Sequence, residues 1–298
     1  MIVAEALVFA RWAHFTAATI LFGAPLFRFC ASRDGRAVWH APDAATLRYV
    51  SFAAAISGLA WLAFSIITVT GEPGSLFDAE LLSAFFLQTG FGLVWLIRLA
   101  ILAAVVALAW RSGPGPVRSA LVAAFASLLL VSQAWLGHAA AVEGWLGPVA
   151  IAAYAVHVLG AGAWIGGLVP LGLELGRLRR GQGMDEADAM RGVLRRFSSM
   201  GMVAVLAILA SGIINTALRI ASWADFLDTD YGRILLAKLG LFAIMLGIAG
   251  INRFALVPLA AARSGTLETI RRNVILELIL GALVLGLAAI LGLQMPPA

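Results

Sequence analysis

The chain has 298 residues, of which 62% are hydrophobic and only 12% are charged. Soluble globular proteins carry about 25% charged residues, so this composition excludes an ordinary soluble protein of this length. The net charge of +5 is almost all arginine, which in a membrane protein lies beside lipid head groups, so it does not indicate a nucleic-acid partner. A single cysteine, Cys30, excludes an internal disulfide.

Eight apolar runs follow one another along the chain, and each is long enough for a helix to cross about 30 Å of hydrocarbon. Because backbone groups cannot stay unpaired in lipid, these runs predict an all-α integral membrane protein with no soluble domain. The predicted spans are 5–28, 48–70, 86–110, 117–138, 148–173, 197–219, 231–251 and 273–293.

The basic residues predict the orientation of these spans. Sixteen lie in or beside the loops that follow odd-numbered spans, against two, Arg219 and Arg233, beside the loops that follow even-numbered spans. By the positive-inside rule, the odd-numbered loops are cytoplasmic and both termini are periplasmic. The longest loop, 174–196, is charged and is expected to extend the neighbouring helices or to form a linker.

The second half of the chain repeats the polar pattern of the first. In spans one and five, His14 and His157 are each followed, after eight residues, by a glycine. The other matched positions are Ser57-Gly58 with Ser211-Gly212, Gly92 with Gly232, Arg98 with Lys238, and Gly137 with Gly292. We therefore predict two four-helix repeats, 1–140 and 148–298, which are parallel because each has an even number of spans.

The two histidines of the repeat are the principal site candidates, because ionisable groups inside a membrane are costly and usually functional. His14 and His157 fall at matching depth near the bilayer centre if the repeat holds. An imidazole nitrogen binds copper, iron or zinc without losing a charge first. The sequence predicts that the two rings share one metal ion or haem iron; the plainer alternative is that each hydrogen-bonds a neighbouring helix.

Three cations lie in the same apolar segments. Arg11 is one helical turn before His14, and Arg98 and Lys238 form a matched pair in mid-span. A buried cation needs a partner, for which Glu5, Glu277 or an anionic ligand such as a haem propionate are candidates. The haem-binding alternative therefore comprises His14 and His157 with these three cations.

Two further ligand candidates lie at the predicted outer surface. His138 ends span four, and Met295 follows span eight. Imidazole and thioether both bind copper, and thioether favours Cu(I), so the pair suggests an outer capture site. The alternative is a boundary histidine and a tail methionine without a role. His40, in a predicted cytoplasmic loop, is expected to be solvated. In span five, Gly162 and Gly166 have the GxxxG spacing that lets two helix backbones approach closely.

The whole chain resembles the copper resistance D (CopD) family of bacterial inner-membrane proteins. The stretches that carry the resemblance are His157-VLGAGAWIGGLVPL, Ser211-Gly212 with Asn215, Tyr231-GRILLAKLG, Asn252-Arg253, and Arg271-RNVILELILGALVLG with Pro296-Pro297. The resemblance implies copper homeostasis, with copper moved from periplasm to cytoplasm beside a periplasmic copper-binding partner of the CopC type. The chain lacks a fused partner domain and any dense methionine- or histidine-rich segment.

Three functions remain open at this stage. The first, which is favoured, is a copper permease with His138 and Met295 outside and His14 and His157 at the midplane. The second is a membrane redox protein in which the two midplane histidines ligate a haem b and pass electrons, for example to Cu(II). The third is a scaffold for a periplasmic partner. No nucleotide-binding motif is present, so we expect no use of ATP.

Overall fold

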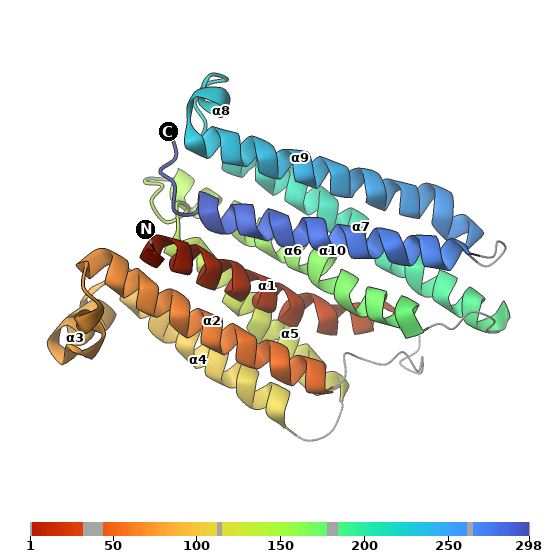
Figure 1. Cartoon of the computed structure of the whole chain (residues 1–298), viewed down its shortest axis with the longest axis horizontal. Helices are drawn as coiled ribbons and strands as arrows, with labels where there is room; N and C mark the ends of the chain where they lie inside the picture. Colours follow the sequence, from red (N-terminus) through yellow and green to blue (C-terminus); the bar gives the residue numbers. More distant parts are fainter. Residues whose placement is uncertain (1, 32–43, 112–114, 178–183, 261–264, 298) are drawn as a thin grey trace.

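The computed structural model of the chain describes residues 2–31, 44–111, 115–177, 184–260 and 265–297, and contains no strand in these ranges. Eight of its helices are long and apolar enough to cross a membrane, which confirms the predicted fold class. They are α1 (Ile2–Ala31), α2 (Ala44–Thr70), α4 (Gly90–Trp110), α5 (Pro116–Val131), α6 (Leu146–Arg177), α7 (Met184–Ala217), α9 (Asp230–Ile251) and α10 (Thr266–Leu291) (Figure 1). The side chain of Cys30, like the whole of His40, lies outside the described residues.

Several helix boundaries differ from the predicted spans. The third span begins at Gly90 rather than near 86, because residues 79–88 form a separate helix, α3 (Ala79–Gln88). The predicted loop 174–196 is shortened from both sides, since α6 continues to Arg177 and α7 begins at Met184. The remaining short elements are η1 (Pro73–Phe77), η2 (Ser132–Leu136), α8 (Asp225–Asp228), the π-helix η3 (Asn252–Leu256) and η4 (Val257–Leu259).

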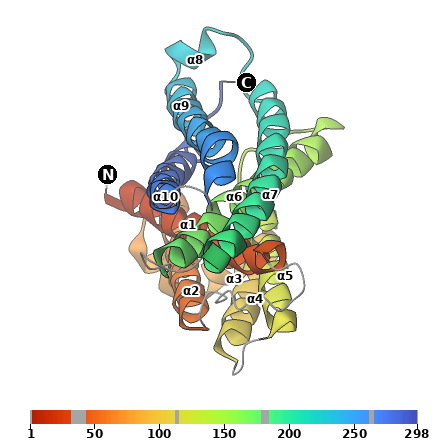
Figure 2. The same cartoon turned by 90° about the vertical axis from the view of Figure 1, so that its right-hand side faces the viewer.

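Helices α1 and α6 lie at the centre of the bundle, with α2, α4 and α5 on one side and α7, α9 and α10 on the other (Figure 2). Their backbones touch: a Cβ atom added at Gly23 would overlap the backbone of Gly162 and Gly166, and one added at Gly166 would overlap that of Thr19. The GxxxG spacing in α6 therefore allows the close helix contact that the sequence predicts, and the partner helix is α1.

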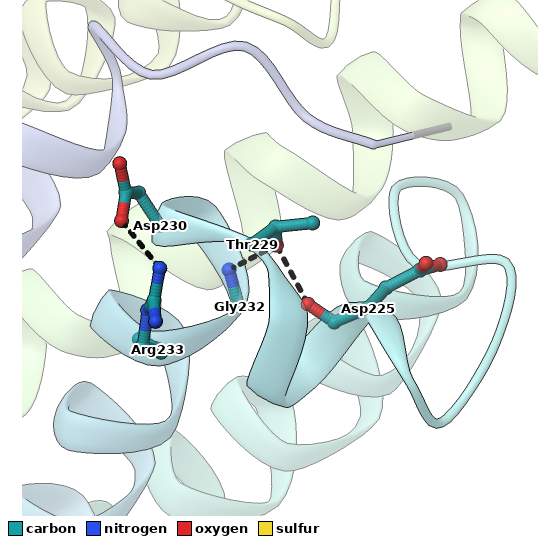
Figure 3. A network of polar contacts seen from close by, with 5 residues as sticks. All are labelled: Asp225, Thr229, Asp230, Gly232 and Arg233. Carbon is teal, nitrogen blue, oxygen red and sulfur yellow. Dashed lines mark hydrogen bonds and ion pairs between the residues drawn. The ribbon is translucent and has the colours of Figure 1, made fainter.

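Corresponding turns in the two halves have the same hydrogen bonds. Thr229 begins α9 by accepting a bond from the Gly232 amide (2.9 Å) and donating one to the Asp225 carbonyl (2.6 Å) (Figure 3). Thr89 makes the same two bonds at the start of α4, to Gly92 (2.9 Å) and Phe85 (2.7 Å). Both glycines are required, because a Cβ atom at either would strike the preceding helix.

Both termini lie at the same end of the bundle (Figure 1), as an even number of spans requires. The described arginines near the N-terminal ends of α2, α5, α7 and α10 lie toward the opposite end, which fits the charge asymmetry of the loops. The assignment of the termini to the periplasm and the division into repeats 1–140 and 148–298 stay predictions.

Candidate functional site

His14 is completely buried and has a protein partner on each ring nitrogen. Nδ1 lies 3.0 Å from the Ala54 carbonyl of α2, and Nε2 lies 2.8 Å from Nη2 of Arg98 in α4. Because a guanidinium only donates, Nε2 must be the unprotonated acceptor and Nδ1 must carry the hydrogen given to Ala54. The ring is therefore a neutral imidazole whose metal-binding lone pair is occupied by Arg98.

Arg98 is also fully buried, and all of its partners are uncharged. Its Nη1 donates to the Leu129 carbonyl (2.9 Å) and to Oγ of Ser132 (2.6 Å). Its guanidinium carbon lies 5.1 Å and 5.0 Å from the ring centroids of Trp61 and Trp95, in the range of cation–π attraction. The positive charge is thus held by neutral acceptors and aromatic faces.

Neither acid proposed as a partner of these cations is one. Glu5 is exposed at the start of α1. Glu277 is buried in α10 and accepts a hydrogen bond from Nδ2 of Asn252 (2.8 Å). Of the candidate partners, the two carboxylates are therefore not bonded to Arg98, whose partners are carbonyl, hydroxyl and imidazole groups.

His157, the counterpart of His14, is only partly buried and has one free ring nitrogen. Nδ1 lies 3.2 Å from both the Ile208 carbonyl and Oγ of Ser211. The Ser211 hydroxyl donates to the Ala207 carbonyl (2.5 Å), so Nδ1 is the donor to both oxygens. Nε2 is then the unprotonated nitrogen, and no hydrogen bond to it occurs in the described part of the chain.

The two serine-glycine pairs that the repeat matches each lie beside one of the histidines. Ser57 donates to the Ala53 carbonyl (2.5 Å), as Ser211 does to that of Ala207. Gly58 faces the His14 ring and Gly212 the His157 ring, each at the Nδ1 and Cε1 edge. The two pockets therefore match in construction, which supports the predicted repeat.

The cations make the two pockets different. Arg98 bonds directly to His14, whereas Lys238, at the matched position, is half-buried and lies within electrostatic range of His157 without a hydrogen bond to it. Each histidine has its own set of partners, and no contact between the two rings occurs among the described residues. Sharing of one ion by both histidines remains a prediction that these contacts do not test.

Arg11 joins α1 to the end of α10. Its Nη1 donates to the Gly292 carbonyl (3.3 Å), and its guanidinium carbon lies 5.2 Å from the ring centroid of Trp61. Tyr154, the counterpart of Arg11 in α6, lies within electrostatic range of both Arg11 and Arg98. The first-half cations therefore surround one tryptophan beside the helix pair α1–α6.

His138 and the segment that carries Met295 come together at the end of the bundle near the termini. Nε2 of His138 lies 3.4 Å from the Leu291 carbonyl, and the ring lies near the backbone of Gln294, which precedes Met295. The Met295 side chain is 90% exposed. Burial lowers the pKa of the His138 imidazole, so the ring is neutral at pH 7, the form that binds a metal.

One polar network was missed in the sequence. Asn273 donates to Oδ1 of Asn252 (2.7 Å), and Asn252 donates to Glu277 (2.8 Å). Asn252 begins the π-helix η3, and such helices are often found at functional sites. The sequence feature that could have revealed this network is Glu277, a carboxylate inside an otherwise apolar final span.

Two family models match the chain. One, described as "Copper resistance protein D-like, N-terminal domain", covers residues 1–148, and the other, described as "Copper resistance protein D", covers residues 191–291. The copper resistance protein D of Pseudomonas syringae pv. tomato is 30% identical over 96% of this chain and 95% of the relative. The chain belongs to the copper resistance protein D family.

Two other relatives carry different names. The inner membrane protein YebZ of Escherichia coli (strain K12) is 33% identical over 83% of this chain and 83% of its own length. The copper transport protein CutJ of Bacillus subtilis (strain 168) is 34% identical over 76% of this chain and 41% of its own length. No solved structure matches. Together with the eight spans, these likenesses identify a multi-pass inner-membrane protein of a copper resistance family.

Proposed function

We propose that this member of the copper resistance protein D family moves copper across the inner membrane, from the periplasm toward the cytoplasm. The observation that carries the proposal is the state of His157. Its Nδ1 is fixed by Ile208 and Ser211, while its Nε2 has a free lone pair. An imidazole that is oriented through one nitrogen and open at the other is suited to bind a metal ion.

His14 is the second station in this proposal, and Arg98 controls it. Copper can bind Nε2 of His14 only when Arg98 withdraws its hydrogen bond (2.8 Å). Because the two histidines have separate partners, we propose that they take the ion in turn rather than hold it together. Nearby cations weaken binding at both stations, which suits a transporter, since a conducted ion must also leave.

The outer end supplies the capture site. The imidazole of His138, which contacts the Leu291 carbonyl at the end of α10, and the exposed thioether of Met295 lie close to the C-terminus. We propose that they accept copper from a periplasmic copper-binding protein of the CopC type. Delivery from a carrier suits an exposed methionine, because a thioether on a mobile side chain readily exchanges a soft ion.

Copper accumulation in cells tests this function. Cells that produce the wild-type chain are expected to accumulate copper above vector controls, and His157→Ala and His14→Ala should each remove most of that increase. His40→Ala is the matched control and should leave it intact. Equal accumulation in the vector control, in the presence of membrane-inserted protein, would contradict transport and favour the scaffold alternative.

The haem alternative rests on one observation: the buried cations Arg11 and Arg98 have no carboxylate partner among the residues that the structure describes. Axial ligation through His14 does not fit the present geometry, because Arg98 occupies Nε2. An absorption spectrum of the purified protein separates the two functions. If the wild type shows a Soret band that is lost in His14→Ala and in His157→Ala, the protein binds haem through these histidines, and electron transfer becomes the proposed function in place of copper transport.

A further inference from the structure

The two halves of the bundle differ at one helix pair. In the first half, α2 and α4 pack against each other, with the rings of Trp61 and Trp95 in edge contact at a centroid distance of 5.1 Å. In the second half, α7 and α9 make almost no direct contact, and the two helices stand apart in Figure 2. The second half is therefore open between two helices whose counterparts in the first half are in contact.

A cleft of about 130 Å³ occupies this opening. Its walls come from α6, α7, α9 and α10 and are almost entirely apolar, as at Leu168, Phe197, Val205 and Leu246. Glu277 lies at its wall, where Asn252 holds the carboxylate. We refer to this space as the α7–α9 cleft.

A second, polar pocket of about 370 Å³ adjoins the α7–α9 cleft at the inner end of the helices. Arg191, Arg195 and Arg253 line it together with Ser198 and Ser199. Arg253 donates from Nη1 to Oγ of Ser198 (2.7 Å), and none of the ion pairs between described residues involves the three arginines. We refer to this space as the arginine pocket.

The two spaces are continuous. Ser198, Arg253, Phe254 and Val257 line both of them. Phe254, on the π-helix η3, is 74% exposed and stands at the junction. A cationic pocket that continues into an apolar cleft, at the end of membrane-spanning helices, has the polarity of a phospholipid.

We propose that an anionic phospholipid binds here, with its phosphate in the arginine pocket and an acyl chain in the α7–α9 cleft. Three guanidinium groups without a carboxylate partner among the described side chains suit phosphate, which arginine binds through paired N–H donors. The serine hydroxyls supply further donors, and basic pockets between helices at the cytoplasmic surface are typical sites for such head groups. This inference does not depend on copper transport.

Native mass spectrometry of the whole protein, purified with phosphatidylglycerol and phosphatidylcholine in equal amounts, tests the proposal. The wild type should retain phosphatidylglycerol preferentially. Arg191→Gln, Arg195→Gln and Arg253→Gln together should lower that retention at least tenfold. The matched control, Arg111→Gln with Arg118→Gln and Arg272→Gln, removes the same charge elsewhere at this end of the bundle and should retain the lipid.

A second pair of variants tests the acyl chain. Gly201 and Gly250 line the cleft, and a Cβ atom at either meets no atom within 4 Å, so a larger side chain begins in open space there. Gly201→Leu with Gly250→Leu should fill the cleft and reduce lipid retention, whereas Gly240→Leu, also in open space but outside the cleft, should not. All variants should elute and melt as folded protein.

Two results would overturn the lipid site. Equal retention of phosphatidylcholine and phosphatidylglycerol by the wild type would exclude recognition of the anionic head group. Displacement of the lipid by millimolar inorganic phosphate, combined with no effect of the cleft-filling leucines, would reveal a site for free phosphate alone.

Discussion

At the scale of single residues, the main finding is that two histidines in matching surroundings differ in availability. His14 gives its lone pair to Arg98, whereas His157 keeps its own free. The difference arises from the residue at one matched position, since Lys238 stands where Arg98 stands in the first half and does not bond to the ring. In the proposed transport, a cation thus controls copper binding at His14 more tightly than at His157.

Removal of that cation should expose His14. Arg98→Gln is expected to raise the affinity for Cu(I) about 10- to 100-fold, because a hydrogen bond to a charged group contributes about 1.5–3 kcal/mol. Competition against a coloured Cu(I) chelator measures the change. Arg11→Gln, which removes a buried cation without a bond to His14, is the control. An unchanged affinity in Arg98→Gln would show that Arg98 does not compete with copper.

The outer histidine should capture copper at unusually low pH. Burial lowers the pKa of His138 below its ordinary value of 6.5, so the neutral, metal-binding form persists as the pH falls below 6.5. The same shift destabilises the fold below pH 6.5, because the unfolded chain then binds a proton that the folded one does not. In a copper titration between pH 5 and pH 7, the copper affinity of the wild type should fall less with decreasing pH than the affinity of an exposed histidine would. In His138→Ala, this acid-resistant copper binding should be absent.

At the scale of helices, the contact between α1 and α6 holds the two halves together. Gly166→Ala should lower the melting temperature, because the new Cβ atom meets the Thr19 backbone, which cannot move away as a side chain would. Overpacking typically costs about 1–3 kcal/mol. Gly240→Ala meets no neighbour and should stabilise slightly through helix propensity. Equal melting temperatures would show that the close contact is not important for stability.

The sequence predicted the helices better than it predicted their contacts. Eight spans follow from apolar length alone, whereas the contact of the matched pairs Ser57-Gly58 and Ser211-Gly212 with the two histidines was not predicted. The helix α3 was missed as a separate element, since its last residues, 86–88, were assigned to the following span and the rest to a loop. The bond between Arg98 and His14 joins residues 84 apart, and no local pattern reveals such a partner.

At the scale of the whole molecule, orientation gives the proposed transport its direction. The sixteen-to-two bias of basic residues predicts periplasmic termini. Alkaline phosphatase, which is active only in the periplasm, should be active when fused after Ala298 and inactive when fused within the loop 178–183. The reverse pattern would place His138 and Met295 in the cytoplasm and would turn the proposed capture site into an exit.

Copper uptake by proteoliposomes that contain only the purified protein tests the central claim most directly. We expect vesicles with the wild type to accumulate copper well above empty vesicles, and vesicles with His157→Ala to lose at least nine-tenths of that uptake. His40→Ala should transport like the wild type. Uptake by His157→Ala at the wild-type rate would contradict the account, because the free Nε2 of His157 would then have no part in carrying the ion.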